Sequence, residues 1–238
     1  MRALLSVYQV LGPLLLVPLS YWLWLGRYGG DHRLTLMTLA VPIVYAYVVP
    51  GVGTNVLKLW KIEARFRWGC FRPHHGFVFG SAAAVLAFLC TAGPMPTTTP
   101  TPTPTLASVA QTAFVMGSVF AFWNWLYDAH AIRAGKLRVH VQPHIPEKSP
   151  AGIAMEYALT VFGGFGAAYA AWLAVLPSAM AEAGFSRTAL TFVAGAILVI
   201  AAPVGGFVLR SYLKYGVSGL RPLGDLGDFD PGMGRRSE

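Results

Sequence analysis

The sequence predicts an all-α membrane protein, a polytopic bundle of six transmembrane helices with both termini in the cytoplasm. The first observation behind this fold class is the composition, because 55% of the 238 residues are hydrophobic and only 12% are charged. Soluble domains are usually about one quarter charged, and the mean hydropathy of this chain is +0.54. The second observation is the length of the apolar runs, and the third is the distribution of Lys and Arg, which gives the orientation.

A bilayer core of about 30 Å requires roughly twenty apolar residues in each helix. Six stretches meet this requirement: residues 4–25, 34–52, 77–95, 106–127, 151–176 and 189–213. The first stretch is too long for the apolar core of a signal peptide and no small-residue cleavage site follows it, so we expect it to remain as a span. Residues 1–213 are therefore predicted to form a single transmembrane domain, and residues 214–238 a polar, disordered cytoplasmic tail.

Lys and Arg residues alone set the orientation of a multi-pass protein. Only three of the 18 Lys and Arg residues, namely Arg27, Arg33 and Arg187, fall on the side opposite the termini. Both termini and the second and fourth loops are therefore predicted to be cytoplasmic, in a cell or cytoplasmic membrane. The net charge of +8 follows from this asymmetry and from attraction to anionic headgroups. It requires no nucleic-acid partner.

The second loop, residues 55–76, is rich in basic and aromatic residues. Lys58, Lys61 and Arg65 recur at helical spacing, with apolar residues on a different face. This pattern indicates either an amphipathic helix lying among the headgroups or a cytoplasmic extension of the second span. The third loop contains the Thr- and Pro-rich run 97–105, which favours a solvated polyproline connector.

The fifth span carries small residues at the spacing that lets membrane helices approach closely. Gly163 and Ala167, and likewise Gly166 and Ala170, are four residues apart. We expect this face to pack inside the bundle, and a homodimer through it is the alternative.

Ionisable residues collect near the cytoplasmic ends of the predicted spans. Such groups are costly near hydrocarbon, so a cluster of them suggests a functional site. The residues that form this cluster are His74, His75, Asp128, His130, His140, His144 and Glu156.

The end of the fourth span brings polar and aromatic side chains together. Asn124 and Asp128 are four residues apart and share a helix face, with Tyr127 beside them. Trp123 and Trp125 complete an aromatic band. This segment is either an interfacial belt, with Asp128 paired to Arg133 or to a basic residue of the second loop, or the floor of a lipid-accessible pocket.

Glu156 is expected just inside the cytoplasmic boundary of the fifth span. An ionised carboxylate at that depth needs a partner, for which Arg133, Arg138 and His130 are the candidates. Glu156 either belongs to the same pocket as Asp128 or extends to the interface on its own.

The histidines are also candidate ligands of a metal centre. His140 and His144 have HxxxH spacing and His74 and His75 are adjacent, which is similar to parts of the histidine boxes of membrane desaturases and hydroxylases. The number and order of the boxes differ from that family, and its HxxHH boxes are absent, so we do not infer membership. With His130, these four residues are the candidate ligands for iron, copper or zinc. We favour metal-free chemistry, because Pro143 disrupts a helical His140–His144 pair.

The leading interpretation is an enzyme that acts on a lipid or isoprenoid by acid–base chemistry. Its catalytic residues would be Asp128, Glu156, His130 and His75, and its substrate-binding residues Asn124, Trp123, Trp125 and Tyr127. The alternative is a non-enzymatic scaffold, assembly or lipid-binding protein, and a His-ligated metalloenzyme comes third. A phosphate-binding loop, a GxSxG motif and an HExxH motif are all absent from the sequence.

Overall fold

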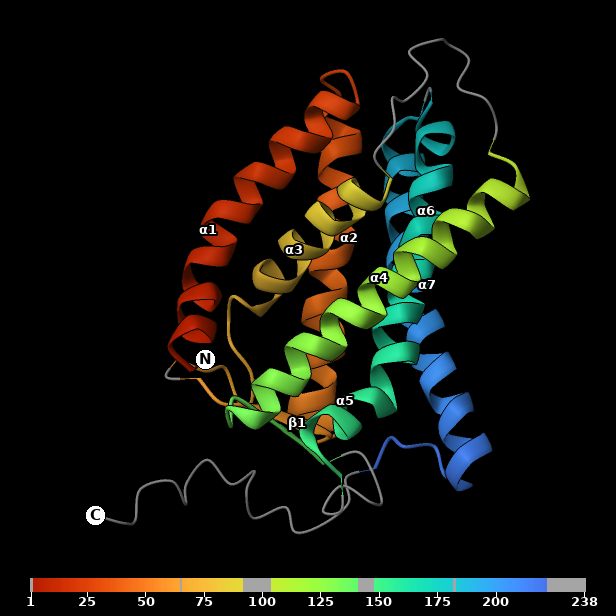
Figure 1. Ribbon diagram of the computed structural model, residues 1–238. Coiled ribbons are helices and arrows are strands. Elements are labelled where there is room, and N and C mark those ends of the chain that lie inside the picture. The colour runs from red at the N-terminus through yellow and green to blue at the C-terminus, as the bar shows by residue number, and fades with distance from the viewer. Residues whose placement is uncertain (1, 65, 92–103, 141–147, 182, 222–238) are drawn as a thin grey trace.

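The structure of the protein is a computed structural model that describes residues 2–64, 66–91, 104–140, 148–181 and 183–221. Figure 1 shows a bundle of long helices with a small two-stranded sheet at one end. The elements in chain order are α1 (Arg2–Arg27), α2 (His32–Gly51), the π-helix η1 (Val52–Val56), β1 (Trp60–Ile62), α3 (His75–Cys90), α4 (Leu106–Arg133), β2 (Leu137–Val139), α5 (Pro150–Ala158), the π-helix η3 (Leu159–Gly163), α6 (Gly164–Met180) and α7 (Phe185–Tyr215). The predicted all-α class is confirmed.

Among the described residues, five helical segments are long and apolar enough to cross a membrane. They are Ala3–Arg27, His32–Val56, Leu106–Arg133, Pro150–Met180 and Phe185–Tyr215. The fifth predicted span is thus the continuous helix α5–η3–α6.

The third predicted span is shorter than expected, because α3 has only 16 residues. It begins inside the bundle, where His74 Nε2 donates to the backbone oxygen of Gln9 at 3.0 Å. Gln9 lies seven residues into α1, so at 1.5 Å per residue α3 starts about 10 Å in from the beginning of α1. Six full-length spans are therefore not confirmed.

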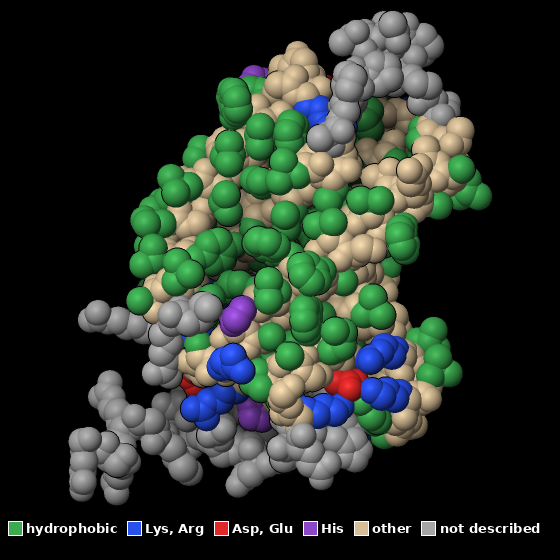
Figure 2. Space-filling view, in the orientation of Figure 1, with side chains coloured by type: hydrophobic (Ala, Val, Ile, Leu, Met, Phe, Trp, Pro, Cys, Tyr) green, Lys and Arg blue, Asp and Glu red, His purple; other side chains and the backbone are tan. Residues whose placement is uncertain are grey.

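The two ends of the bundle differ in charge. Arg27 Nη2 donates to the Thr91 oxygen at 2.5 Å and Arg33 Nη1 to the Ala183 oxygen at 2.7 Å. These bonds bring the α1–α2 turn, the end of α3 and the start of α7 to one end, while α1 begins and α7 ends at the other (Figure 1). Figure 2 shows apolar side chains over the middle of the visible face and most of the visible Lys and Arg side chains near the end where α1 begins. These features are those of a multi-pass membrane protein.

The small residues of α6 and η3 contact neighbouring helices of the same chain. A Cβ atom at Gly166 would lie 2.9 Å from the Met116 backbone oxygen and from the Phe120 Cβ of α4, and one at Gly163 would lie 3.3 Å from the Ala121 Cβ. The face therefore packs inside the bundle. A homodimer through the fifth span stays a prediction.

The second loop does not form the predicted amphipathic helix, and it extends α2 only by the five residues of η1. Lys58 has a left-handed backbone with φ of 56°, which interrupts a helix. The chain then forms β1, which pairs antiparallel with β2 in the register Trp60–Val139 and Ile62–Leu137. Leu59 and Ile62 are buried by this pairing, so burial of apolar side chains overrides the helical spacing of the basic ones.

The C-terminal end of α7 extends past the predicted boundary at residue 213. The helix ends at Tyr215, where Gly216 adopts a left-handed conformation with φ of 70°. Leu220 then packs against Leu59 and Phe207. The part of the predicted tail beyond residue 221 lies outside the described residues, and so does most of the Thr- and Pro-rich run. At the end of that run, Thr105 caps α4 by accepting a hydrogen bond from the Ser108 N–H at 3.1 Å.

Candidate functional site

A cavity of about 390 Å³ lies at the charged end of the bundle, between α2, α4, α5–η3 and α7. Its walls are apolar and include Val49 of α2, Phe162 of η3 and Phe207 of α7. The two strands close one side of it through Trp60 and Leu137. The unexpected sheet therefore helps to form this cavity.

Asp128 and Tyr157 form the central polar contact of the cavity wall. The Tyr157 hydroxyl of α5 donates to Asp128 Oδ2 of α4 at 2.7 Å, and both residues line the cavity. Asp128 is 9% exposed. Its partner is therefore a tyrosine of the neighbouring helix, and Arg133 is not part of this contact.

Arg72 brings a buried positive charge to the same region. It lies in the segment that precedes α3, is 5% exposed, donates to the Tyr127 hydroxyl and interacts electrostatically with Asp128. Burial lowers the pKa of Arg72, and Tyr127, Tyr8 and Asp128 raise it in part. A guanidinium keeps its proton in proteins, so Arg72 compensates the Asp128 carboxylate. Arg72 belongs to the second loop, which is one of the two sources of a basic partner expected for Asp128.

Several polar atoms in this region lack partners among the described residues. The buried Nδ1 of His75 and the buried hydroxyl of Tyr45 accept or donate no hydrogen bond there, and both residues line the cavity. The Nε and Nη1 atoms of Arg72 are likewise buried without a partner in the described part of the chain. Leaving such a group unsatisfied costs about 1–3 kcal/mol, so each calls for an explanation such as a bound molecule.

Two of the four predicted binding residues line the cavity. Asn124 and Tyr127 share the face of Asp128 and line it, and Asn124 Nδ2 also donates to the Phe120 oxygen at 2.9 Å. Trp123 is 54% exposed on the outside of α4. Trp125 donates from Nε1 to the Ala151 oxygen at 3.0 Å and so fastens α4 to α5. Successive residues of a helix are about 100° apart, which is why the aromatic band does not point to one place.

The histidines are spread over the charged end of the bundle. His75 lines the cavity, His74 binds Gln9 of α1, and His130 lies in the last turn of α4. His140 donates its backbone N–H to the Leu59 oxygen at 2.7 Å beside the sheet, and His144 lies outside the described residues. Within the part of the chain that the structure describes, no three His, Cys, Asp or Glu side chains are close enough to hold a metal ion.

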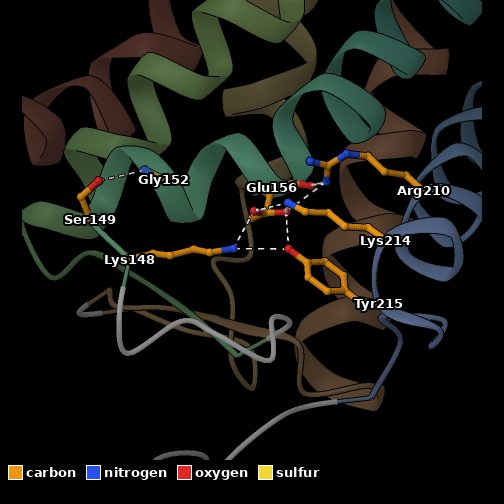
Figure 3. Close-up of polar contacts among 7 residues, drawn as sticks. All are labelled: Lys148, Ser149, Gly152, Glu156, Arg210, Lys214 and Tyr215. Atoms are coloured by element: carbon orange, nitrogen blue, oxygen red, sulfur yellow. Dashed lines mark hydrogen bonds and ion pairs between the residues drawn. The ribbon is translucent and has the colours of Figure 1, made fainter.

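Glu156 belongs to a second polar cluster rather than to the cavity (Figure 3). Its carboxylate accepts from Lys148 Nζ at 2.6 Å, from Lys214 Nζ at 2.8 and 3.0 Å and from the Tyr215 hydroxyl at 2.8 Å. Arg210 Nη1 lies 3.3 Å from Oε2 and also donates to the Glu156 backbone oxygen. The expected partners Arg133, Arg138 and His130 do not appear among these contacts.

The predicted single site is therefore divided between two places. Glu156 and Tyr157 are consecutive in α5, so their side chains leave the helix in directions about 100° apart. Tyr157 enters the cavity with Asp128, and Glu156 faces the end of α7. Of the predicted catalytic residues, the structure brings Asp128 and His75 to the cavity, while Glu156 and His130 are not among the residues that line it.

The sequence interpretation missed Tyr45, Arg72 and Tyr157 as site residues. Arg72 is one of several basic residues of the second loop, and the signal that sets it apart is its position between Phe71 and Pro73, an apolar setting for a charge. Tyr157 follows Glu156 directly. Because successive residues of a helix point about 100° apart, Tyr157 could have been considered as a side chain that points into the bundle in another direction. Tyr45 carries no local signal, because tyrosines are frequent in spans of this kind.

Comparison of the chain with protein-family models, with curated proteins and with solved structures gives no match. The class of protein is therefore set by fold and site alone. It is a multi-pass membrane protein with an apolar cavity and a buried polar wall.

Proposed function

We propose that this membrane protein binds a lipid or isoprenoid in its cavity, with the oxygen-bearing head of the ligand against the polar wall. The observation that carries this proposal is that His75 and Tyr45, which line a mostly apolar cavity, each have a buried polar atom, Nδ1 and the hydroxyl oxygen, with no partner among the described residues. The polar head of a ligand would supply the partners that these two atoms lack.

The size and lining of the cavity favour a ligand with one apolar chain. Ligand pockets range over roughly 300–1,000 Å³ and are mostly apolar with a few polar groups that fix orientation. At about 390 Å³ this cavity is near the lower end, which suits a single acyl or isoprenoid chain better than a two-chain phospholipid.

The polar wall offers both donors and acceptors to a head group. Tyr45 can donate, and the Nδ1 of His75 can donate or accept according to its tautomer. Arg72 adds two donor nitrogens, Nε and Nη1, that have no partner among the described residues. A hydroxyl, carbonyl or carboxyl head group matches this set.

The ligand has a route from the bilayer along α2. Val48 and Val52 line the cavity and are 41% and 43% exposed, so the cavity reaches the surface beside them. An apolar molecule can therefore enter sideways between apolar residues without crossing the charged end.

A second candidate function is acid–base catalysis on the bound lipid or isoprenoid. The observation that favours it is that His75, Asp128 and Tyr157 line one cavity, so a proton acceptor and a hydrogen-bonded carboxyl–phenol pair face the same ligand. In this version His75 and Asp128 are the catalytic residues. Glu156 and His130 have no part in it.

The proposal includes a topology of six crossings with both termini in the cytoplasm. Its support is that α1 begins and α7 ends at the same end of the bundle (Figure 1), the end where most Lys and Arg residues lie. In this topology α3 crosses as a short helix that starts inside the protein.

The direct test is to identify what co-purifies with the full chain from a mild detergent. Lipid extracts analysed by mass spectrometry should contain one single-chain lipid or isoprenoid at close to one molecule per protein. Val161→Trp, which fills the cavity, should remove it, and the matched control Val193→Trp, on the exposed side of α7, should retain it. Extracts that show only bulk membrane lipid, or that are unchanged by Val161→Trp, would overturn the proposal.

The catalytic version requires a further observation. Extracts of wild-type protein should then contain two chemically related species, a substrate and its product. In Asp128→Asn and His75→Gln only the substrate should remain bound. Binding of a single species that these substitutions leave unchanged would restrict the function to binding.

A further inference from the structure

The cluster around Glu156 holds more positive charge than its carboxylate neutralises (Figure 3). Lys148, Arg210 and Lys214 all form ion pairs with this one carboxylate. Burial lowers the pKa of Lys148, but hydrogen bonds with Glu156 and Tyr215 raise it by more, so Lys148 is firmly protonated. Three cations and one anion leave a net charge of about +2 in a space of a few ångströms.

Lys148 and Arg210 keep donors for a second acceptor. An ammonium group has three N–H donors, and Lys148 binds two acceptor atoms among the described residues, on Glu156 and Tyr215. Lys214 binds both carboxylate oxygens of Glu156 and the Tyr215 hydroxyl. Arg210 donates only through Nη1 in the part of the chain that the structure describes, which leaves Nε and Nη2. The side chains of Lys214, Arg210 and Lys148 are 45%, 29% and 24% exposed, so a ligand can reach them.

The cluster lies at the level where a membrane helix meets the headgroups. Arg210 and Lys214 occupy the last two turns of α7, and their neighbours Leu209 and Leu213 are 61% and 81% exposed. Apolar residues with that exposure on a spanning helix face lipid. Phe207, three residues before Arg210, lines the cavity, so the cluster follows the cavity toward the charged end.

We infer that Lys148, Arg210 and Lys214 bind the phosphate group of an anionic phospholipid, with Glu156 holding the three cations together. Basic pockets between membrane helices on the cytoplasmic side bind such headgroups. Phosphate offers the acceptor oxygens that two ammonium groups and a guanidinium need. This site is separate from the cavity and does not depend on the proposed function.

The experiment measures binding of the full chain, purified in a neutral detergent, to mixed micelles that contain phosphatidylglycerol or phosphatidylcholine. Phosphatidylglycerol should bind more tightly. Lys148→Gln and Lys214→Gln should each weaken this preference about fivefold, which corresponds to the loss of one cation at the membrane surface. Glu156→Gln should strengthen the binding, because the amide oxygen still accepts hydrogen bonds that hold the cations together while the competing negative charge is removed. Arg133→Gln, an exposed basic residue on α4 outside the cluster, should leave it unchanged.

A second arm separates a headgroup from a free anion. If inorganic phosphate at millimolar concentration competes with phosphatidylglycerol, the site recognises the phosphate group alone. If it does not compete, the site requires the lipid, and both results support the inference. Equal binding of the two lipids, or equal effects of Lys214→Gln and Arg133→Gln, would overturn it. The lysine variants keep Glu156 paired with Arg210, so the test does not depend on whether Glu156→Gln folds.

Discussion

The Tyr157 hydroxyl donates a hydrogen bond to Asp128 Oδ2 at 2.7 Å and so joins α5 to α4 at the wall of the cavity. Tyr157→Phe keeps the ring and removes this donor. Hydrogen bonds to charged groups contribute about 1.5–3 kcal/mol, so the variant should unfold more easily by that amount. The measurement is the unfolding of purified protein in detergent by denaturant.

The matched control is Tyr212→Phe, because Tyr212 is 54% exposed on α7. That variant should keep the stability of the wild type. A Tyr157→Phe protein as stable as Tyr212→Phe would show that the Asp128–Tyr157 bond does not hold the two helices together.

The packing of α6 on α4 gives a second prediction. Gly166→Ala places a Cβ 2.9 Å from a backbone oxygen and from the Phe120 Cβ, and overpacking of this kind costs about 1–3 kcal/mol. Gly205→Ala, on α7, meets nothing within 4 Å and should be neutral or slightly stabilising, since alanine favours a helix. The two variants are compared by thermal unfolding. If both behave alike, the close approach of α4 and α6 is wrong.

Topology is tested with reporter fusions. A reporter placed in the Thr- and Pro-rich run 97–105 should lie outside the cytoplasm, and one at the C-terminus inside it, because the Lys and Arg residues are so unequally divided. Two reporters on the same side would exclude the three crossings, by α4, by α5–η3–α6 and by α7, that lie between the two reporters.

Metal content is the fourth prediction. We expect no stoichiometric iron, copper or zinc in gently purified protein, because His74 binds Gln9 of α1, His75 lines the cavity and His140 lies beside the sheet. Elemental analysis is the measurement. A metal that is present at one per chain and lost in His140→Ala would make the protein a metalloenzyme instead.

The membrane character and the number of long helices follow from sequence because they depend on local composition. Apolar runs of about twenty residues are sufficient to predict spans, and five of the six have the expected length. The exception is α3, whose start is set by a contact between His74 and Gln9 of another helix. A pairing between residues 65 positions apart leaves no trace in the local pattern.

The two-stranded sheet at the charged end was not predicted, because it too depends on a contact between segments that are far apart in the sequence. Each strand of the sheet has only three residues, which is too short for a recognisable alternation of apolar and polar residues. The two strands are also separated in the sequence by the whole of α3 and α4. Burial of Leu59 and Ile62 then decides the conformation of a segment whose basic residues suggest a helix.

The candidate site was predictable as a set of residues and not as one place. Asn124, Tyr127 and Asp128 share a helix face, and the structure keeps them together at the cavity. Glu156 was grouped with them by its depth in the membrane. The depth of a residue in the membrane fixes its position along the helix but not the direction in which its side chain points. The Glu156 side chain points toward Lys148 and Lys214.

The most direct test of a ligand in the cavity is an experimental density map of the protein prepared without removal of its lipids. An elongated feature should fill the space between α2, α4 and α7, with its polar end within hydrogen-bond distance of Tyr45 and His75. A cavity that contains only ordered water at Tyr45 and His75, or one closed by repacked side chains, would contradict lipid or isoprenoid binding at this site.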